Sequence, residues 1–243
     1  MEVAEYSKMD EVEKNHWWFV AKRRYLAAML ARFTPSATRP TILDIGCGTG
    51  AIMEFVASLG YKVEGIDLTE EALRHCREKN LSVKLGRAEQ IPYPDNSFDI
   101  IIASDVLEHV LDDAAAVREV GRVLRPGGRF IATVPAHQAL FSYHDKALHH
   151  VRRYGKKQFA RTLGAHLTLE YISWIHAAIL LPAAFLRLVA RSRNASGESD
   201  VKPTPAFINK GMKLVYALEF AWFKLFKTLP FGLSLMAVAR KED

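Results

Sequence analysis

The stretch of sequence that decides the fold reads Thr41-Ile-Leu-Asp-Ile-Gly-Cys-Gly-Thr-Gly50. Its apolar first half predicts a buried strand. Immediately after it, apolar residues recur with the spacing of one helix face, and Gly60 ends the pattern. These residues are Ile52, Phe55, Val56 and Leu59. The three glycines therefore occupy a turn between a strand and the start of a helix.

Glycine suits this turn because the backbone must bend tightly and a ligand can approach it without meeting a Cβ. The helix start offers free N–H groups and partial positive charge to a ligand anion. Gly46, Gly48 and Ala51 also fit the dinucleotide fingerprint, so an NAD(P)-dependent oxidoreductase is an alternative. Asp44 argues against it, because an acid beside the turn repels pyrophosphate but can accept hydrogen bonds from an ammonium group.

Residues 43–50 resemble motif I of the class I S-adenosylmethionine-dependent methyltransferases. In that family the loop holds the methionine end of the cofactor. The resemblance implies S-adenosyl-L-methionine as the cofactor. It assigns cofactor binding to Asp44, Gly46, Cys47, Gly48 and Gly50.

A second acid, Asp67, follows the apolar strand pattern of residues 61–67 and precedes a helix capped by Thr69. An acid at the carboxyl end of the second strand is placed for hydrogen bonds to the two ribose hydroxyls. We therefore expect Asp67 and its neighbour Leu68 to contact the cofactor. Residues 86–92 resemble the family's Gly-Asp-Ala-Glu-x-Leu-Pro stretch facing adenine, which implies Ala88 and Glu89. Arg87 replaces the usual acid, so Glu89 or the backbone would take that contact.

Residues 100–103 form an apolar run fit for a strand buried on both faces, and Ser104 to His109 follow it. The family resemblance extends over this segment and implies cofactor contacts from Ser104, Asp105 and His109. No Asn/Asp-Pro-Pro-Tyr follows, which disfavours methylation of a planar amine on a base or a glutamine. Neither cysteine lies here, which disfavours attack on a pyrimidine carbon. With the Arg-Pro-Gly-Gly turn at 125–128, the resemblance runs from about residue 40 to 135.

The resulting fold class is α/β, a Rossmann-like doubly wound seven-stranded sheet with an α-helical insertion before the last strand. We expect one methyltransferase domain over residues 1–243. Its parts are an N-terminal helical cover (1–35), a cofactor-binding core (36–176), a basic apolar helical insertion (177–230) and a final edge strand (231–243).

Residues 144–154 contain three histidines and an acid, and their His-x-Arg-Arg-Tyr segment resembles the loop covering the acceptor in this group of methyltransferases. An oxygen acceptor would have to lose its proton. The candidate bases are His150, His109 and His149, with His150 first. The spacing fits no closed zinc pattern, so no metal is expected.

The insertion begins in an uncharged run, residues 171–186, that Pro182 interrupts. This run is shorter than the ~20 residues needed to cross a bilayer. A second helix, about 209–227, is rich in aromatic residues, and four of its lysines share an arc of roughly 100°. They are Lys210, Lys213, Lys224 and Lys227. Lysines beside aromatics suit a bilayer interface; the alternative is that both helices pack on the sheet.

Charge is unevenly distributed along the chain. Residues 151–243 hold 15 Lys/Arg against 6 Asp/Glu, and residues 1–150 hold 18 against 21. A basic C-terminal third indicates an anionic partner surface. A membrane is favoured over nucleic acid, because the basic residues alternate with aliphatic blocks. Two cysteines without a disulfide framework, and no signal-peptide pattern in residues 1–22, favour the cytoplasm, peripheral on the inner face of the membrane.

The sequence thus predicts methyl transfer from S-adenosylmethionine to a small, lipophilic acceptor, such as a quinone precursor or a polyprenyl-linked or lipid-like molecule. A glycan intermediate or a soluble natural product is the alternative acceptor. A noncatalytic, membrane-associated cofactor-binding protein is the other class that stays open beside the oxidoreductase.

Overall fold

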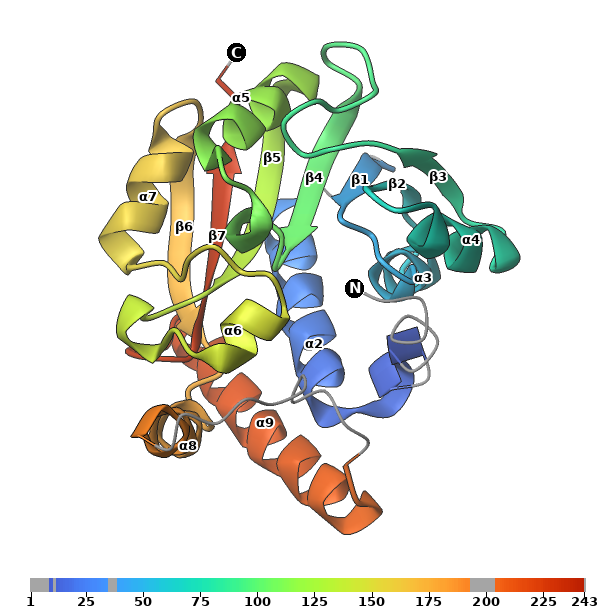
Figure 1. Cartoon of the computed structure of the whole chain (residues 1–243). Helices are drawn as coiled ribbons and strands as arrows, with labels where there is room; N and C mark the ends of the chain where they lie inside the picture. The colour runs from blue at the N-terminus through green and yellow to red at the C-terminus, as the bar shows by residue number, and fades with distance from the viewer. Residues whose placement is uncertain (1–8, 11, 35–38, 193–203, 243) are drawn as a thin grey trace.

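In the computed structural model, the described residues are 9–10, 12–34, 39–192 and 204–242. Seven strands in these residues form one sheet in the order β3-β2-β1-β4-β5-β7-β6 (Figure 1). The first five strands are parallel, and β7 runs antiparallel to both of its neighbours. The strands are β1 (Thr41–Ile45), β2 (Lys62–Asp67), β3 (Ser82–Leu85), β4 (Phe98–Ser104), β5 (Leu124–Pro135), β6 (Thr168–Ile175) and β7 (Ser234–Arg240). The predicted seven-stranded α/β fold is confirmed.

One strand position differs from the prediction. The final strand, β7, is not at the edge of the sheet: it lies between β5 and β6, and β6 is the edge strand. The reason is visible in the burial of the two strands. All of β7 from Ser234 to Ala239 is buried, whereas β6 alternates between exposed and covered residues over its first half. A strand that is apolar throughout gains more from a neighbour on each side than a strand with one wet face.

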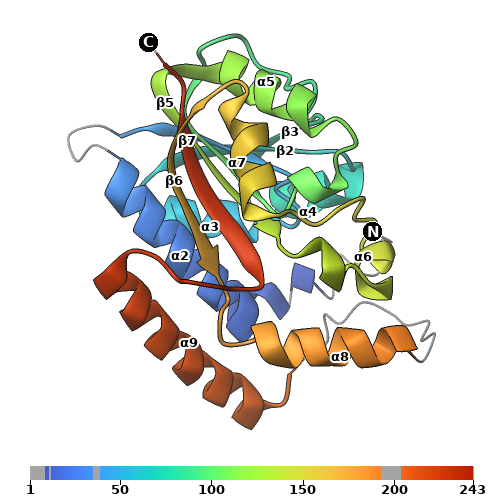
Figure 2. The same ribbon diagram turned by 90° about the vertical axis from the view of Figure 1, so that its left-hand side faces the viewer.

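Helices cover both faces of the sheet (Figure 2). On one face, α5 (Asp113–Val123) buries its apolar side against β5, and α7 (Lys156–Gly164) packs beside it on β6 and β7. On the other face lie α2 (Trp17–Phe33), α3 (Ala51–Ser58) and part of the insertion. The remaining helix of the core, α4 (Glu70–Glu78), packs beside β2 and β3. The two hydrophobic layers fix β1 and β4 at the centre, so their carboxyl ends stay at one defined rim.

The insertion consists of α8 (Leu180–Ser192) and α9 (Ala206–Phe226). One side of α9 packs along α2, where the Tyr25 and Phe223 rings meet edge to face at 4.9 Å and Trp17 stacks on Tyr216 at 5.4 Å. Residues 193–203, between these two helices, lie outside the described residues. None of the helices in the described residues is long and apolar enough to cross a membrane.

The predicted N-terminal cover is described from residue 9, apart from residues 11 and 35. Residues 9–10 and 12–15 are helical, and α2 follows after His16. Because α2 lies between the sheet and α9, it connects the cofactor-binding half of the fold to the insertion (Figure 1).

Candidate functional site

The glycine turn follows β1 and begins α3, as the sequence predicts. Gly46, Gly48 and Gly50 have φ angles of +67°, +54° and +87°, a region that L side chains rarely adopt. A Cβ on Gly46 would lie 2.7 Å from Cγ2 of Val106, whereas a Cβ on Gly48 would meet nothing within 4 Å. The loop therefore packs tightly on one side and leaves its backbone open on the other.

Asp44 lies directly before this turn and is 1% exposed. Its Oδ2 has no hydrogen-bond partner among the described residues. Burial, reinforced by the nearby Asp67, raises the pKa of this carboxyl to about 8. A buried acceptor without a partner is costly, and it is stabilised when a cationic donor reaches it.

Asp67 ends β2 beside the glycine turn. Its Oδ2 accepts from the Gly48 backbone N–H at 3.0 Å, and its Oδ1 accepts from the N–H and hydroxyl of Thr69 at 3.1 Å. The carboxylate is only half-buried and keeps lone pairs for further donors. The three bonds fix its orientation at the rim of the sheet.

The residues predicted around the adenine lie next to this acid. The N–H of Gly86 donates to the Asp67 carbonyl at 3.0 Å, which brings the segment after β3 against the end of β2. Ala88 is buried and Glu89 half-buried, whereas Leu68 is 62% exposed. None of Leu68, Ala88 and Glu89 is among the lining residues of the cavity described next.

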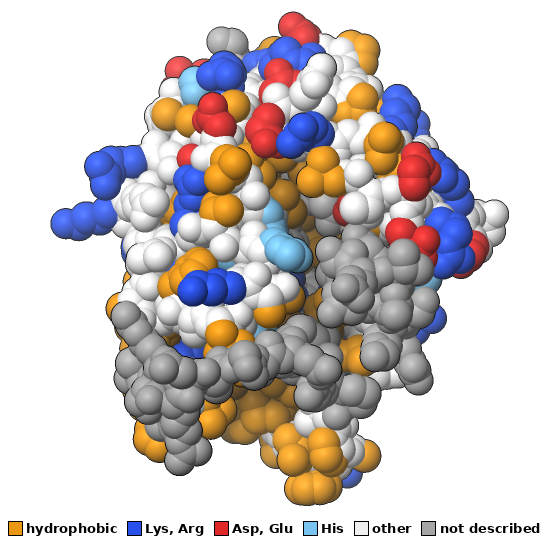
Figure 3. All heavy atoms as spheres, viewed as in Figure 1, with side chains coloured by type: hydrophobic (Ala, Val, Ile, Leu, Met, Phe, Trp, Pro, Cys, Tyr) orange, Lys and Arg blue, Asp and Glu red, His pale blue; other side chains and the backbone are white. Residues whose placement is uncertain are grey.

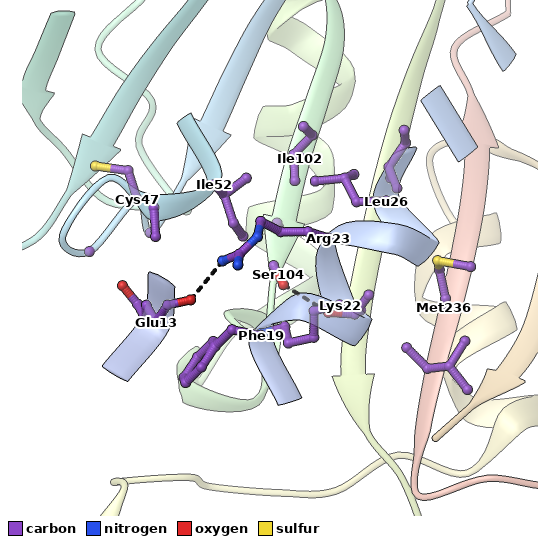
Figure 4. A pocket seen from close by; sticks show the side chains of 17 residues that line it. Glu13, Phe19, Lys22, Arg23, Leu26, Cys47, Ile52, Ile102, Ser104 and Met236 are labelled. Atoms are coloured by element: carbon purple, nitrogen blue, oxygen red, sulfur yellow. Dashed lines mark hydrogen bonds between the residues drawn. The ribbon is translucent and has the colours of Figure 1, made fainter. Parts of the chain in front are cut away.

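A cavity lies between the glycine turn, the ends of β4 and β5, and α2 (Figure 4). Of the predicted cofactor residues, Gly46, Cys47, Gly48 and Ser104 line it. Apolar side chains make up much of the rest of its wall. They are Phe19, Leu26, Ala51, Ile52, Ile102, Ala103, Ile131, Ile175 and Met236. Such walls exclude water from whatever binds there.

Four polar residues of this cavity are not among the predicted cofactor residues, namely Glu13, Lys22, Arg23 and Thr133. The Thr49 hydroxyl donates to the Glu13 carboxylate, which fastens the N-terminal segment over the glycine turn. The Arg23 guanidinium donates to the Glu13 and Lys14 carbonyls and so holds the same segment (Figure 4). The only sequence signal for these cavity residues was the charge of the N-terminal cover. The residues that they contact lie far away in the sequence, so the contacts could not be predicted.

Asp105 follows β4 with a φ angle of +57° and lies at the border of the cavity. Its carboxylate accepts from Lys22 Nζ at 2.8 Å and from the Thr133 hydroxyl at 2.9 Å. Burial alone would raise the pKa of Asp105, but Lys22 and Thr133 hold it below its ordinary value. Because both carboxylate oxygens are engaged, Asp105 acts through Lys22 and Thr133 and positions the cavity wall. Ser104 bonds the same Thr133 hydroxyl at 3.2 Å.

The three histidines predicted as bases lie in different surroundings. The rings of His109 and His150 meet edge to face, with centroids 4.7 Å apart. His150 Nδ1 lies 3.0 Å from Asp145 Oδ1, while His149 is exposed and has a φ angle of +58°. The structure thus brings His109 and His150 together and turns His149 outward.

The Arg-Arg-Tyr segment beside these histidines is a buried support. Arg153 Nε donates to Asp145 Oδ1 at 2.7 Å, and the Tyr154 hydroxyl donates to Asp113 at 2.8 Å. Arg153 is 2% exposed and Tyr154 is fully buried. Both side chains therefore hold the segment in place.

Comparison with known proteins agrees with this geometry. Residues 43–132 match the family model described as a methyltransferase domain. A probable S-adenosylmethionine-dependent methyltransferase of Mycolicibacterium smegmatis is 32% identical over 51% of this chain and 47% of its own length. A ubiquinone biosynthesis O-methyltransferase of Mesorhizobium japonicum is 38% identical over 46% of this chain and 49% of its own length. The matches span about half the length of these curated relatives.

Solved structures share the fold over a longer span. A putative methyltransferase in complex with the Haloferax volcanii Trm112 activator aligns over 99% of this chain and 95% of its own, with a TM-score of 0.64 and 19% identity. Geranyl diphosphate C-methyltransferase of Streptomyces coelicolor aligns over 89% of this chain and 78% of its own, with a TM-score of 0.58 and 17% identity.

The strand order and the glycine turn, together with the matched family model, define the class of this protein. Residues 43–132 form a methyltransferase domain, and the sheet around it has the class I S-adenosylmethionine-dependent methyltransferase fold. S-adenosylmethionine is the cofactor of this class, which disfavours the dinucleotide alternative.

Proposed function

We propose that the chain transfers a methyl group from S-adenosylmethionine to a small, lipophilic acceptor presented at a membrane surface. The observation that carries the choice of acceptor is the outward face of α9, which is apolar along the whole helix. When bound, the cofactor supplies a methyl group made electrophilic by its sulfonium. The task of the chain is then to hold the cofactor, align the acceptor and exclude water.

The residues of the first half of the sheet fit this cofactor. The unpartnered Oδ2 of Asp44 offers an acceptor for the ammonium group of its methionine end. Gly48 leaves open space where a side chain would block close approach. Asp67, held by the Gly48 and Thr69 N–H groups, is placed for the ribose hydroxyls. Lys22 and Arg23 on α2 provide cations on the opposite wall for its carboxylate.

The outward face of α9 supports a lipophilic acceptor. Phe207, Leu214, Leu218 and Leu225 share an arc of about 40° at 100° per residue, and Phe207 and Leu225 are 77% and 73% exposed. Trp222 and Phe226, each about half exposed, continue this face. The opposite side of the helix, with Tyr216 and Phe223, is buried against the domain. Figure 3 shows hydrophobic side chains gathered where α9 projects from the molecule.

An apolar face of this length is unusual on a solvated surface and marks an interaction site. Lys210, Lys213, Lys224 and Lys227 lie on the arc between the outward face and the buried side. Exposed leucines with lysines at their border are the arrangement of a helix lying in a bilayer interface that carries anionic lipids. Leu181 and Phe185 of α8, the other helix of the insertion, are also exposed. We therefore commit to an anionic membrane surface as the partner.

The names of similar proteins support the same class of acceptor. Three relatives are named ubiquinone biosynthesis O-methyltransferases, and two fold neighbours were solved with geranyl diphosphate. Others favour a soluble acceptor as the second candidate, since one relative is a norajmaline N-methyltransferase and one neighbour a putative sarcosine dimethylglycine methyltransferase.

The test is methyl incorporation from isotopically labelled S-adenosylmethionine into lipid and aqueous extracts, read by mass spectrometry. We expect label in a lipid-soluble product formed by the wild-type chain. Asp67→Ala is the matched inactive control, because losing a charge-assisted contact costs about 1.5–3 kcal/mol and so at least tenfold in cofactor affinity. Label only in aqueous products would favour the soluble acceptor. Cofactor affinity unchanged in a folded Asp67→Ala variant would overturn the cofactor site.

A further inference from the structure

Glu108 is a buried carboxylate that no hydrogen bond satisfies within the described residues. It is 0% exposed, and neither Oε1 nor Oε2 has a hydrogen-bond partner among the described residues. Burial of this kind costs several kcal/mol unless the charge is compensated. Glu108 belongs to η1 (Leu107–His109), directly after the central strand β4, so its position is fixed by the core.

Two histidines present ring nitrogens to this carboxylate. His150 Nε2 lies 4.0 Å from Glu108 Oε1, and one ligand atom from each of Glu108, His109 and His150 lies within 4.8 Å of the others. Ligand atoms around one divalent ion bound at about 2.0–2.2 Å are separated by somewhat less. The three atoms would have to move closer together for one ion to bind all of them.

The second nitrogen of the His150 imidazole is held by a neighbouring acceptor. His150 Nδ1 lies 3.0 Å from Asp145, whose carboxylate also accepts from Arg153 Nε at 2.7 Å. In metal sites a histidine typically donates its other N–H to a carboxylate or a backbone carbonyl, which turns the free lone pair toward the ion. This pattern accounts for Asp145, which would orient His150 without binding the ion itself.

We propose that Glu108, His109 and His150 bind one divalent cation on the acceptor side of the site. Two imidazoles and one carboxylate suit Zn²⁺ or Mn²⁺, and three protein ligands leave a position open for an acceptor hydroxyl. His109 is exposed, so this position faces outward. A bound cation lowers the pKa of a hydroxyl that it coordinates. The proton then leaves to water, and His150 becomes a ligand in place of the base that the sequence predicts.

The sequence pattern could not show this site. Glu108 and His109 follow β4, and His150 comes about 40 residues later, after α6 (Tyr143–Ala147). The spacing matches no local metal motif, and only the return of the chain to the end of β4 brings the ligands together. The hydrogen bond from the Val151 N–H to the Glu108 carbonyl, at 2.8 Å, holds the returning chain against the segment that follows β4.

The experiment is titration of tag-free, chelator-treated protein with Zn²⁺ or Mn²⁺ alone, followed by calorimetry. We expect one ion per chain. Glu108→Gln and His150→Ala should each weaken binding by more than the roughly 10–100-fold that loss of an outer partner costs. Asp145→Asn should weaken cation binding by an amount within that range. His166→Ala, which removes an exposed histidine beyond α7, is the matched control and should bind as the wild type does.

Melting curves and titration with S-adenosylhomocysteine show whether each variant is folded. If Glu108→Gln does not fold, the exposed His109→Ala variant carries the test. Equal binding by all variants, or no binding by the wild type at millimolar ion, would overturn the cation site. The role given to the cation rests on the proposed function, and the two fail separately. Unchanged methyl transfer by cation-free enzyme would overturn only the role of the cation in the reaction. Cation binding without any affinity for S-adenosylhomocysteine overturns only the methyltransferase.

Discussion

At the scale of single residues, this site is built on carboxylates in unequal surroundings. Asp105 and Asp67 have their oxygens engaged by fixed donors. Asp44 and Glu108 are more deeply buried, yet have oxygens without hydrogen-bond partners among the described residues. A folded chain keeps an unsatisfied buried acceptor only at a cost, so these two positions are where we place cationic ligands.

Asp44→Asn should stabilise the ligand-free protein and weaken cofactor binding. The folded pKa of Asp44 is about 8, above its ordinary value of 3.8. Between these values the unfolded chain releases a proton that the folded chain keeps, so the free energy of unfolding falls as pH rises through this interval. Asparagine has no such proton to release, so the free energy of unfolding of the variant does not fall for this reason. Urea unfolding should show a larger gain over the wild type at pH 8 than at pH 5.

Titration with S-adenosylhomocysteine supplies the other half of this test. We expect affinity at least tenfold lower for Asp44→Asn, since a charge-assisted contact is worth about 1.5–3 kcal/mol. Glu70→Gln, an exposed acid at the start of α4, serves as the control for charge removal. The same stability gain at both pH values would contradict the burial argument.

At the scale of elements, α9 has two apolar sides with different partners. Its inner side packs on α2 through Tyr216 and Phe223, and its outer side is exposed. The sequence showed that the helix is aromatic and basic but could not assign its residues to either side. That assignment came from the docking of α9 against α2, which buries one arc and leaves the other free.

The wild-type chain should cosediment with acidic liposomes, less with neutral ones, and detach in part at high salt. Each Lys or Arg near an anionic leaflet contributes about 1 kcal/mol, and salt screens this attraction. Glutamate at Lys210, Lys213, Lys224 and Lys227 should abolish sedimentation. Serine at Leu214, Leu218 and Leu225 should reduce it even at low salt, because the apolar contact is lost.

The matched control carries four charge reversals outside the insertion, at Lys62, Lys146, Lys157 and Arg161, which are all exposed. This variant should sediment nearly as the wild type does. All variants should keep their affinity for S-adenosylhomocysteine. Equal sedimentation of the control and the α9 variant would show that net charge alone drives binding, and indifference to lipid charge would favour a different partner for α9.

At the scale of the whole molecule, one acid connects the N-terminal cover, the edge of the sheet and the insertion. Glu219 of α9 accepts from the Tyr25 hydroxyl at 2.5 Å, from the His176 N–H at 3.1 Å and from the Ala178 N–H at 2.7 Å. Because α2 also lines the cavity through Lys22 and Leu26, the insertion supports the cofactor site through this contact.

Glu219→Ala should lower the free energy of unfolding by about 2–4 kcal/mol, since it leaves three donors without their acceptor. Thermal or urea unfolding measures this loss, and affinity for S-adenosylhomocysteine should fall with it as α2 loosens. Glu78→Ala, an exposed acid at the end of α4, should change stability by less than about 0.5 kcal/mol. A loss no greater than that of the control would refute the coupling between the insertion and the cover.

The sequence by itself determined the order of the elements, the glycine turn and the two acids that follow β1 and β2. These are local properties, because a short apolar run, a turn and a helix face are each legible over some ten to twenty residues. Only the tertiary structure decided that β7 lies inside the sheet and that Glu13 and Lys22 reach the cavity. It also brought Glu108, His109 and His150 together. These features depend on contacts between segments far apart in sequence, and the packing of the layers, which no local pattern encodes, selects them.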